Sequence, residues 1–275
     1  QLGPSLLGFP PGRVRTIPTA GSAAPPPEWA SDFDYEMLGP LVFPRFGAFA
    51  EAALSLDELG LRFLPSQADV DDFYLDENEV TVASYLSFLK APDGYQRAAH
   101  WRDANPDEKR REQLITSLAN SDPRLPVTGL DYYECSAYAR WAGKRLPTPR
   151  EWEYAARGGK QYRAFSCLGD EFDRGELAVS VREPWPVEDG CDLITSGIAE
   201  GVRNLCSNVS EWVADQDASE FFAAGSSYQD GQYHFSILRP SKPSDRPVNT
   251  GFRCAADASF VRDQLETSRS IRFTI

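Results

Sequence analysis

Hydrophobic and polar positions follow two different periods in the first clearly patterned stretch of the chain. Residues 73–75 (FYL) form a short hydrophobic run typical of a strand. Val82, Tyr85 and Leu89 are then three or four positions apart, which is the spacing of one helix face. Thr81 stands where a helix N-cap belongs, because its hydroxyl can accept a hydrogen bond from a free backbone N–H. The pattern predicts a strand followed by a helix.

A second helix is predicted in the segment LDYYECSAYARWAGKRLP. Tyr138 and Trp141 are three positions apart and share a helix face. Gly143 fits a C-terminal cap, and Pro147 cannot continue the helix because it lacks a backbone N–H.

A third helix is predicted to begin directly afterwards, at a capping box. The hydroxyl of Thr148 can accept from a free N–H, while Glu151, three positions on, reaches back to the backbone of Thr148. Pro149 between them suits the first helical position. The helix is expected to end at the glycines of residues 158–159.

The rest of the chain lacks long periodic stretches. Residues 1–30 contain seven prolines and cannot sustain a helix or a central strand. Residues 35–50 suggest a short strand pair, and residues 91–125 are predicted as a polar surface excursion. Gly, Pro, Ser, Asp and Asn are frequent from residue 160 to 257, which favours loops and short strands.

These elements predict one loop-rich α+β domain at residues 35–257, with two main helices and short antiparallel strands. A proline-rich N-terminal arm at residues 1–34 precedes it, and a C-terminal extension at residues 258–275 follows it. The chain of 275 residues is long enough for a core that folds without disulfides or metals.

Charge and composition exclude several functions. Lys+Arg minus Asp+Glu is 28 − 41 = −13, which argues against nucleic acid as a partner, because binding a phosphate backbone needs clustered basic side chains. No hydrophobic run approaches the roughly 18–20 residues that span a bilayer, so no transmembrane segment is predicted. The two histidines, His100 and His234, are too few for a three-histidine iron or zinc site.

The five cysteines form no C-x-x-C pair, so a zinc knuckle or a thioredoxin-like motif is not expected. Their number alone does not establish a disulfide framework, and buried thiols that pack as small hydrophobic groups remain an alternative.

The chain starts at Gln1 rather than at methionine, which fits a processed protein. We therefore expect an exported protein that is periplasmic, secreted or at the cell surface after removal of a signal peptide.

Four segments together resemble the formylglycine-generating enzyme (sulfatase-modifying factor) family. Their order and spacing match that family across roughly residues 37–257, and the second segment is too unusual for a chance match. The resemblance implies a variant of the C-type-lectin-like fold. The segments are FYLDENEVTVASYLSFL, PVTGLDYYECSAYARWAGKRLPTPREWEYAARGG, NLCSNVSEWVAD and GFRCAAD.

The resemblance does not extend to the family's copper site. Its enzymes oxidise a cysteine of a substrate peptide with copper held by two cysteines that follow a Gly-Gly-Ser-Trp segment. Here Ser226 or Ser227 matches the serine of that segment, and no cysteine follows until Cys254. Copper(I) prefers thiolate ligands, and a related iron-dependent branch needs more histidines, so neither copper nor iron is expected.

A calcium site is implied by the resemblance. The family supplies oxygen ligands from Asn-x-x-Gly-Asn-x-x-Glu-Trp, which matches NLCSNVSEW here. The implied ligands are the side chains of Asn204 and Glu211 and the carbonyls of Ser207 and Val209, a set of oxygens that suits Ca²⁺. Ser207 replaces the usual glycine, so strain is expected if this turn needs a positive φ. The alternative is a loop that keeps the fold with water or a lysine in the metal position.

The resemblance also implies a disulfide. Family members often link a cysteine just before Trp-Ala-Gly-Lys to the one in Gly-Phe-Arg-Cys, and here Cys135, one helical turn earlier, is the candidate partner of Cys254. Two buried free thiols are the alternative. A second predicted pair joins Cys167 and Cys191 and leaves Cys206 unpaired and buried.

Other prominent side chains are predicted to be structural. Arg145 and Arg253 are expected to pair with buried carboxylates such as Glu153 or Glu79. Three tryptophans are expected in the core because large aromatic residues bury the most surface. They are Trp141, Trp152 and Trp212.

The leading functional hypothesis is a non-catalytic binding or scaffold protein. Its partner would be another protein or a surface polymer, bound by the N-terminal arm or by the groove around residues 226–234 that corresponds to the family's copper site, called the former copper groove below. One alternative is a family enzyme with different chemistry, and another is a ligand-display protein with a variable surface at residues 225–250. Ser227, Tyr228 and His234 are the weak catalytic candidates, and the enzyme alternative adds Ser226, Asp230 and Tyr233.

Overall fold

The computed structural model describes residues 60–66, 70–102, 104–158, 183–189, 201–214, 219–230 and 238–261. Several sequence predictions lie outside the described residues: the N-terminal arm, the strand pair at 35–50 and most of the C-terminal extension. Tyr233, His234, Cys167 and Cys191 also lie outside them.

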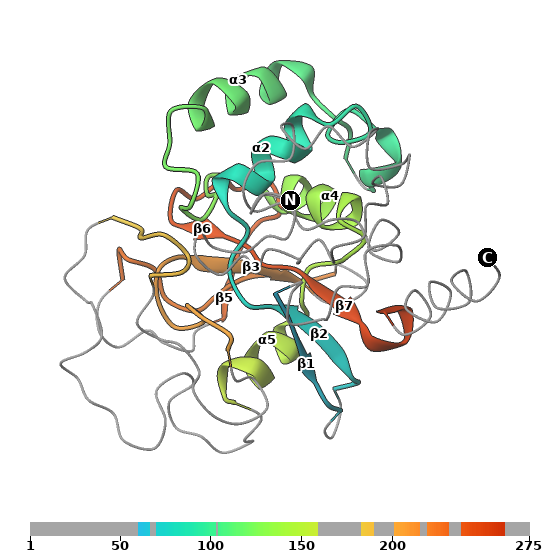
Figure 1. Ribbon diagram of the computed structural model, residues 1–275, viewed down its shortest axis with the longest axis vertical. Helices are drawn as coiled ribbons and strands as arrows, with labels where there is room; N and C mark the ends of the chain where they lie inside the picture. Colours follow the sequence, from blue (N-terminus) through green and yellow to red (C-terminus); the bar gives the residue numbers. More distant parts are fainter. Residues whose placement is uncertain are drawn as a thin grey trace, which may run out of the picture.

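Two small sheets form the centre of the described structure (Figure 1). The first is antiparallel, with order β1-β2-β7, and consists of β1 (Leu61–Leu64), β2 (Phe73–Asp76) and β7 (Ala255–Asp257). The second has order β5-β4-β3-β6 and consists of β3 (Ser210–Ala214), β4 (Phe221–Ala224), β5 (Leu238–Pro240) and β6 (Thr250–Gly251). Only the β3–β6 pair is parallel within the described strands.

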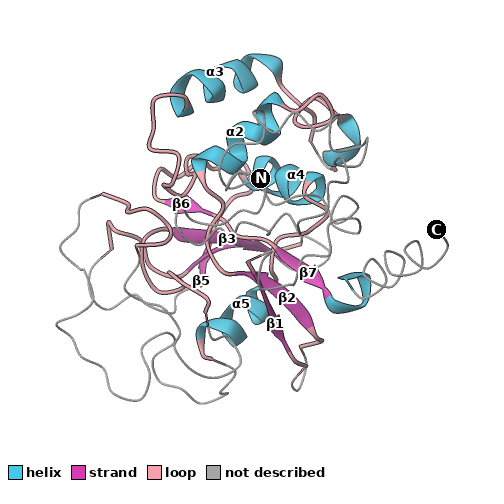
Figure 2. Ribbon diagram, viewed as in Figure 1, coloured by secondary structure: helices cyan, strands magenta, loops and turns pink. Residues whose placement is uncertain are grey.

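Four labelled α-helices surround the sheets in the described part of the chain (Figure 2), and residues 258–261, directly after β7, are also helical. Helices α2, α3 and α4 lie together on one side of the strands, and α5 lies on the other side (Figure 1). The four helices are α2 (Val82–Lys90), α3 (Glu108–Leu118), α4 (Tyr132–Trp141) and α5 (Pro149–Ala156), and a 3-10 turn, η4 (Ala98–His100), precedes α3.

The three helices predicted from the sequence are confirmed together with their caps, as is the α+β class. Thr81 accepts a hydrogen bond from the backbone of Ser84 at the start of α2. Thr148 and Glu151 form the predicted capping box of α5. Gly143, with φ of 73°, follows α4 in the left-handed region where only glycine is free of steric cost.

Helix α3 corrects the prediction of a polar surface excursion at residues 91–125. Asp107 caps its N-terminus by accepting from the backbone of Arg110. Leu114 and Leu118, one turn apart, are its buried side chains, so one narrow hydrophobic face holds an otherwise polar helix on the core.

Strand β3 separates two hydrophobic clusters because its side chains alternate between the faces of the sheet. Trp212 packs in the first cluster, together with Phe88 and Tyr138. Its neighbour Val213 packs in the second cluster against Trp152. The core positions predicted for Trp141, Trp152 and Trp212 are confirmed, since each is at most 4% exposed.

The cysteine predictions are wrong for the described residues. Cys135 and Cys254 are both free and fully buried, so they are two packed thiols rather than a disulfide. Cys206, predicted to be unpaired and buried, is buried but disulfide-bonded. Cysteine packing depends on loop paths that the spacing in the sequence does not reveal.

We expect neither Cys135 nor Cys254 to react with a thiol reagent such as Ellman's reagent at pH 8 while the protein is folded. Burial raises the pKa of both thiols well above 9.0, so the reactive thiolate is scarce as well as inaccessible. Counting free thiols by mass spectrometry after alkylation tests this, with denatured protein as the control. Peptides that contain Cys135 and Cys254 should be alkylated only after denaturation, and alkylation of either residue in the folded protein contradicts the packing.

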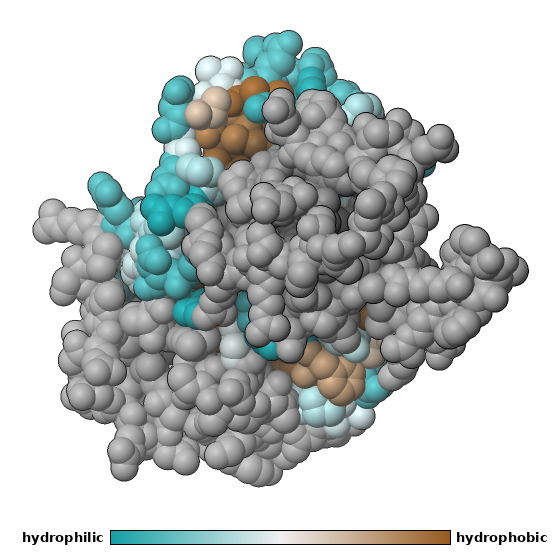
Figure 3. Space-filling view, in the orientation of Figure 1, coloured by the Kyte–Doolittle hydropathy of each residue, from teal (hydrophilic) through white to brown (hydrophobic). Residues whose placement is uncertain are grey.

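The described surface carries few hydrophobic groups. The view in Figure 3 shows two small hydrophobic areas: one in the upper part of this face, where Figure 1 draws α2 and α3, and one in the lower part, where it draws β1 and β2. Phe63 of β1 is 44% exposed and leans on the ring of Tyr74, 5.2 Å away. Among the described helices, none is long and apolar enough to cross a membrane.

Candidate functional site

The segment that matches the copper region begins at Gly225, directly after β4. Gly225 has φ of 76°, and a side chain there would meet the carbonyl oxygen of Leu205 at 2.7 Å and the ring of Trp152 at 2.9 Å. Glycine is therefore required at this position, because the turn packs directly on the backbone of Leu205 and on Trp152 of α5. This close approach fixes where the following residues, Ser226 to Asp230, are presented.

Ser227 is fully hydrogen-bonded in this turn. Its hydroxyl donates to Oδ2 of Asp230 at 2.8 Å and accepts from Nδ2 of Asn249 at 2.8 Å. The backbone N–H of Gln229 donates to the same hydroxyl at 3.3 Å. A hydroxyl with one donor and two acceptor positions has no capacity left, so Ser227 lacks the free geometry of a nucleophile.

Asp230 is a poor general base in this arrangement. Burial alone would raise its pKa, but hydrogen bonds from the hydroxyl and backbone of Ser227 and the charge of Arg239 lower the pKa of Asp230 below 3.8. A base works best with a pKa near the operating pH. Asp230 thus holds the turn closed, since its carboxylate joins Ser227 to Arg239 of β5.

Tyr228 is held by its backbone rather than by its ring. Its N–H donates to the carbonyl of Asn208 at 2.8 Å, and its hydroxyl accepts from the side chain of Gln229 at 3.2 Å. Ser227, Tyr228 and Asp230 lie in one turn, whereas Tyr233 and His234, the other members of the predicted group, lie outside the described residues. Among the described residues, Ser227 contacts no general base whose pKa lies near neutral pH.

Two buried hydroxyls near this turn lack partners. Ser207 and Ser226 are 8% and 5% exposed, and the side-chain oxygen of each makes no hydrogen bond within the described structure. An unpaired buried hydroxyl costs about 1–3 kcal/mol, so these two positions do not serve stability.

Glu211, one of the four predicted calcium ligands, lies in the centre of the sheet and is bound by an arginine. Both carboxylate oxygens accept from Nε of Arg253, at 2.9 and 2.8 Å, and one also accepts from its Nη2 at 2.7 Å. Nε1 of Trp152 donates to the other oxygen at 2.9 Å. Both side chains of the ion pair are at most 1% exposed. The prediction that Arg253 pairs with a buried carboxylate is confirmed, but the residue is Glu211.

Arg253 also joins the two sheets. Its Nη1 donates to the carbonyls of Asp76 and Glu77 at the end of β2, both at 3.0 Å, and its Nη2 donates to the carbonyl of Arg203 at 2.6 Å. Burial alone would lower its pKa, but Glu211 beside it keeps the pKa of Arg253 raised. A permanently charged guanidinium with all its N–H groups used is a rigid connector.

Glu79 is the third charged group of this buried network. Burial raises its pKa to about 8, Arg253 opposes that rise, and the charge of Glu211 adds to it. Its two carboxylate oxygens accept from Nδ2 of Asn204 at 2.9 Å and of Asn208 at 3.0 Å. Around neutral pH the carboxyl of Glu79 is mainly protonated and uncharged. The core therefore holds the Glu211–Arg253 ion pair without an additional negative charge that lacks a partner.

Asn204 and Asn208 connect Glu79 to the segment of residues 183–189. Nδ2 of Asn204 donates to the carbonyl of Val187 at 2.8 Å. Asn208 bonds both backbone groups of Trp185, accepting from its N–H at 3.1 Å and donating to its carbonyl at 3.2 Å. These two asparagines thus hold in place a segment that has no regular secondary structure.

The expected strain lies at the asparagines rather than at Ser207. Asn204 and Asn208 have φ of 60° and 64°, and they are the non-glycine residues with positive φ in the described structure. Asparagine tolerates this conformation better than most residues. Ser207 is not among the residues with positive φ, so the strain that would follow from a positive φ at this position does not arise.

The predicted calcium ligands do not fit a calcium ion as they are arranged here. The carboxylate of Glu211 already accepts from a guanidinium and an indole N–H, which use both of its oxygens. Oδ1 of Asn204, the atom that would bind calcium, accepts from Nε1 of Trp185 at 3.5 Å, while its Nδ2 holds Glu79 and Val187. Calcium takes six to eight oxygen ligands, and binding it here would require Glu211 to leave Arg253. The structure places a cationic side chain, that of Arg253, on the predicted carboxylate ligand.

We therefore expect calcium to change the melting temperature of the purified protein very little. A ligand present at 100 times its Kd stabilises a folded protein by about 2.7 kcal/mol, which is a shift of several degrees for a chain of this size. Differential scanning calorimetry in EDTA, in calcium and in magnesium as the control measures this. A saturable rise of several degrees with calcium alone would show that Glu211 exchanges Arg253 for the ion.

Arg145 is also an ion-pair residue, with partners that the sequence did not suggest. It binds Glu151 of α5 at 2.6 Å and Asp257 of β7 at 2.7 Å. Glu153, the suggested partner, pairs instead with Arg157 one turn along the helix. Arg145 thus ties the start of α5 to the first sheet.

With the geometry described, comparison with known proteins gives the family. A model of the sulfatase-modifying factor enzyme 1-like domain matches residues 46–258. The chain belongs to this family.

Among its relatives are active and inactive proteins by name. It is 30% identical to the formylglycine-generating enzyme of Streptomyces coelicolor, over 69% of this chain and 79% of that protein. It is 28% identical to the inactive C-alpha-formylglycine-generating enzyme 2 of Bos taurus, over 58% of this chain and 57% of that one. It also matches the serine/threonine-protein kinase Pkn1 of Chlamydia trachomatis at 29% identity, but spans 26% of that protein's length.

Solved structures similar to this chain include that of CarF and that of PvdO, the latter from Pseudomonas aeruginosa. Each aligns with a TM-score of 0.46, at 16% and 20% sequence identity. The alignments cover 70% and 72% of this chain and 88% and 91% of those chains, respectively.

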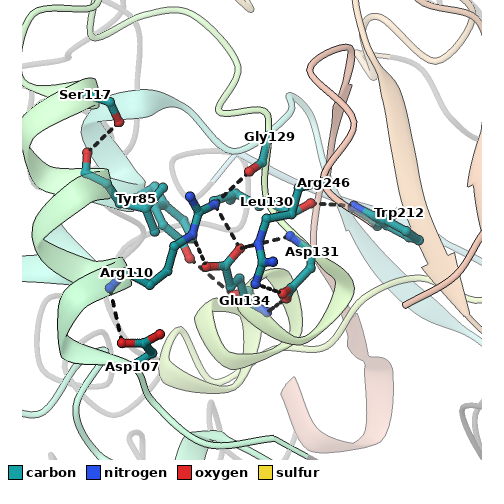
Figure 4. Close-up of polar contacts among 11 residues, drawn as sticks. Tyr85, Asp107, Arg110, Ser117, Gly129, Leu130, Asp131, Glu134, Trp212 and Arg246 are labelled. Carbon is teal, nitrogen blue, oxygen red and sulfur yellow. Dashed lines mark hydrogen bonds and ion pairs between the residues drawn. The ribbon is translucent and has the colours of Figure 1, made fainter. Parts of the chain in front are cut away.

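Sequence reasoning missed one group of polar residues. Arg110, Asp131, Glu134 and Arg246 meet beside α3 and α4 (Figure 4). Asp131 and Glu134 have the three-residue spacing of a capping box, and that signal was present in the sequence. Arg110 lies in α3, which was not predicted, and Arg246 lies in the loop before β6, so no local pattern predicted that they would converge.

Proposed function

We propose that this chain is a non-catalytic binding protein of the sulfatase-modifying factor family. One observation carries the proposal: the positions that follow Gly225 hold Ser, Ser, Tyr, Gln and Asp, and no cysteine occurs between Cys206 and Cys254. The family's copper chemistry needs a pair of thiolates in this stretch, because copper(I) is a soft ion. The function is therefore binding rather than oxidation.

The arrangement of the turn supports this proposal. Asp230 is bound by Ser227 and Arg239, and Ser227 by Asn249. Ser227 and Asp230 are thus held in an internally bonded structural element rather than presented as reactive groups. A relative named as inactive within the same family supports the idea that the fold persists without oxidase activity.

The partner in this proposal is another protein or a surface polymer, reached through the N-terminal arm or the former copper groove. The net charge of −13 favours partners other than nucleic acid. We further propose that the protein acts outside the cytosol, where the disulfide of Cys206 is stable.

A competitive copper(I) titration against a chromogenic chelator such as bicinchoninate tests this proposal. The purified chain should take no copper from the chelator, whereas the Streptomyces coelicolor formylglycine-generating enzyme serves as the positive control. Alkylating the free thiols of unfolded chain before a repeat titration controls for copper bound by denatured protein. Tight binding of one copper(I) per folded chain would overturn the proposal.

A further inference from the structure

A polar pocket of about 530 Å³ lies between the N-terminal ends of α3 and α4, separate from the former copper groove. The excursion before α3 contributes one wall, α4 contributes the opposite wall, and the loop before β6 contributes Arg246. The residues that line it are Tyr95, Trp101, Ala104, Asn105, Asp107, Lys109, Arg110, Gln113, Asp131, Tyr133, Glu134 and Arg246.

Two arginines are fixed in the pocket by one buried carboxylate. Glu134 is 2% exposed and binds Nε of Arg110 at 2.8 Å and Nε of Arg246 at 3.2 Å. Nη2 of Arg110 also donates to the carbonyl of Gly129 at 2.8 Å, and Nη2 of Arg246 donates to Asp131. Figure 4 shows both guanidinium groups converging on Glu134 from opposite sides. The two cations are thus pre-positioned before any ligand binds.

The two arginines of this cluster keep N–H donors to spare. Oε2 of Glu134 accepts from Arg110, from Arg246 and from the backbone N–H of Asp131. Asp131 accepts from the backbone of Glu134 and from Arg246. By contrast, the Nη1 groups of Arg110 and Arg246 make no hydrogen bond within the described residues. Both carboxylates are bound within the cluster, and the four N–H bonds of the two Nη1 groups remain for a ligand.

The charge around the pocket favours a ligand with a single negative charge. Lys109, Arg110 and Arg246 carry three positive charges, and Asp107, Asp131 and Glu134 carry three negative ones, so the lining is neutral overall. A singly charged oxyanion meets the free N–H groups with little repulsion, whereas a dianion such as a phosphate monoester opposes three nearby carboxylates. Guanidinium groups match the geometry of a carboxylate.

Aromatic side chains provide a place for the rest of the ligand. Trp101 lies 4.8 Å from the ring of Tyr95 in an edge-to-face contact and is fixed by a hydrogen bond from its Nε1 to the carbonyl of Tyr95 at 2.7 Å. Trp101 and Tyr133 are partly exposed in the pocket lining. An apolar or aromatic body beside the carboxylate would pack on these rings.

We propose that this pocket binds a carboxylate attached to an apolar or aromatic group, through the free N–H groups of Arg110 and Arg246. Two sources carry this chemistry: a free organic acid and the C-terminal residue of a peptide. The inference goes beyond the proposed function, because it names a ligand and a site that do not depend on the copper groove.

Isothermal titration calorimetry with benzoate, benzamide and phenyl phosphate tests the ligand class. We expect saturable benzoate binding, at least tenfold weaker binding of the neutral benzamide, and weaker binding of phenyl phosphate. Two peptides ending in phenylalanine, with a free or an amidated C-terminus, distinguish the sources. If the free-acid peptide binds at least tenfold more tightly than benzoate and the amide does not bind, the ligand is a peptide terminus; if benzoate binds and neither peptide does, it is a small acid.

Variants separate the site from an effect on folding. Arg246→Gln should weaken benzoate binding at least tenfold, and Lys109→Gln should weaken it about threefold by loss of one nearby charge. Lys90→Gln, an exposed change of the same charge at the end of α2, is the matched control and should have no effect. Thermal melts report whether each variant is folded. The indole N–H signal of Trp101, assigned with Trp101→Phe, should shift with benzoate in the unmodified chain.

The proposal is overturned if benzoate does not bind at millimolar concentration. It is also overturned if folded Arg246→Gln binds benzoate as the unmodified chain does, or if benzamide binds equally well. None of these results bears on copper(I) binding, so failure here is distinct from failure of the proposed function.

Discussion

Replacement of Arg253 by methionine is expected to lower the free energy of unfolding by about 3–5 kcal/mol, because it leaves the buried carboxylate of Glu211 without its partner. It also removes three hydrogen bonds to backbone carbonyls that connect the two sheets. Denaturant unfolding, followed by circular dichroism, measures the change. The strain of an unpaired charge should also raise the exchange rate of backbone amides in β3.

The matched control replaces both members of the pair. Arg253→Met combined with Glu211→Leu removes the unpaired charge, and in other proteins apolar replacement of a buried ion pair is often neutral or stabilising. We expect the double variant to recover at least half of the loss. If Arg253→Met alone costs less than about 1 kcal/mol, the value typical of an exposed pair, the network does not hold the core as described.

Asn208→Ala is expected to cost about 2–4 kcal/mol. It leaves the N–H and carbonyl of Trp185 and one oxygen of Glu79 without partners, each a loss of about 1–3 kcal/mol when fully buried, although water can satisfy part of it. It also places alanine at φ of 64°, which costs about 1–2 kcal/mol. Chemical denaturation measures the total, and hydrogen exchange at residues 183–189 should rise most.

Asn208→Gly separates the two causes. Glycine relieves the backbone strain but makes none of the side-chain hydrogen bonds, so Asn208→Gly should be about 1 kcal/mol more stable than Asn208→Ala and still well below the unmodified chain. Equal stability of the unmodified chain and Asn208→Gly would show that the side chain of Asn208 does not hold residues 183–189.

The sequence predicted those parts of the fold whose causes are local. Helices α2 and α5 were found from their caps, since Thr81 and Thr148 act on residues three positions away. Helix α3 was missed because only Leu114 and Leu118 of its eleven residues are buried, so its periodicity is weak. Its N-cap, Asp107, was the one local signal available.

The buried network was predictable only as a list of charged residues. Glu211 and Arg253 are 42 positions apart, and Asn208 and Glu79 are 129 positions apart. Their pairing depends on how the sheets and loops pack, which no local pattern contains. The resemblance to the family marked Asn204 and Glu211 as polar side chains that converge, but it did not reveal that an arginine would occupy Glu211.

Some features of the candidate site are visible in the sequence, and others only in the structure. The absence of a cysteine between Cys206 and Cys254 is visible in the sequence, whereas the closure of the turn by Ser227, Asp230 and Asn249 is visible only in the structure. Both observations support the proposal, because Ser227 and Asp230 bind each other in place of a reactive pair.

The most direct test of the central claim, that this family member is not an oxidase, is peptide mass spectrometry. The chain is incubated with copper(I), oxygen, a reductant and a peptide with the cysteine-containing motif that the Streptomyces coelicolor enzyme converts, and that enzyme is run in parallel. We predict that the cysteine of the peptide stays unchanged with this chain while the control converts it to formylglycine. Formation of formylglycine by this chain, at a rate that depends on its concentration, would contradict the account.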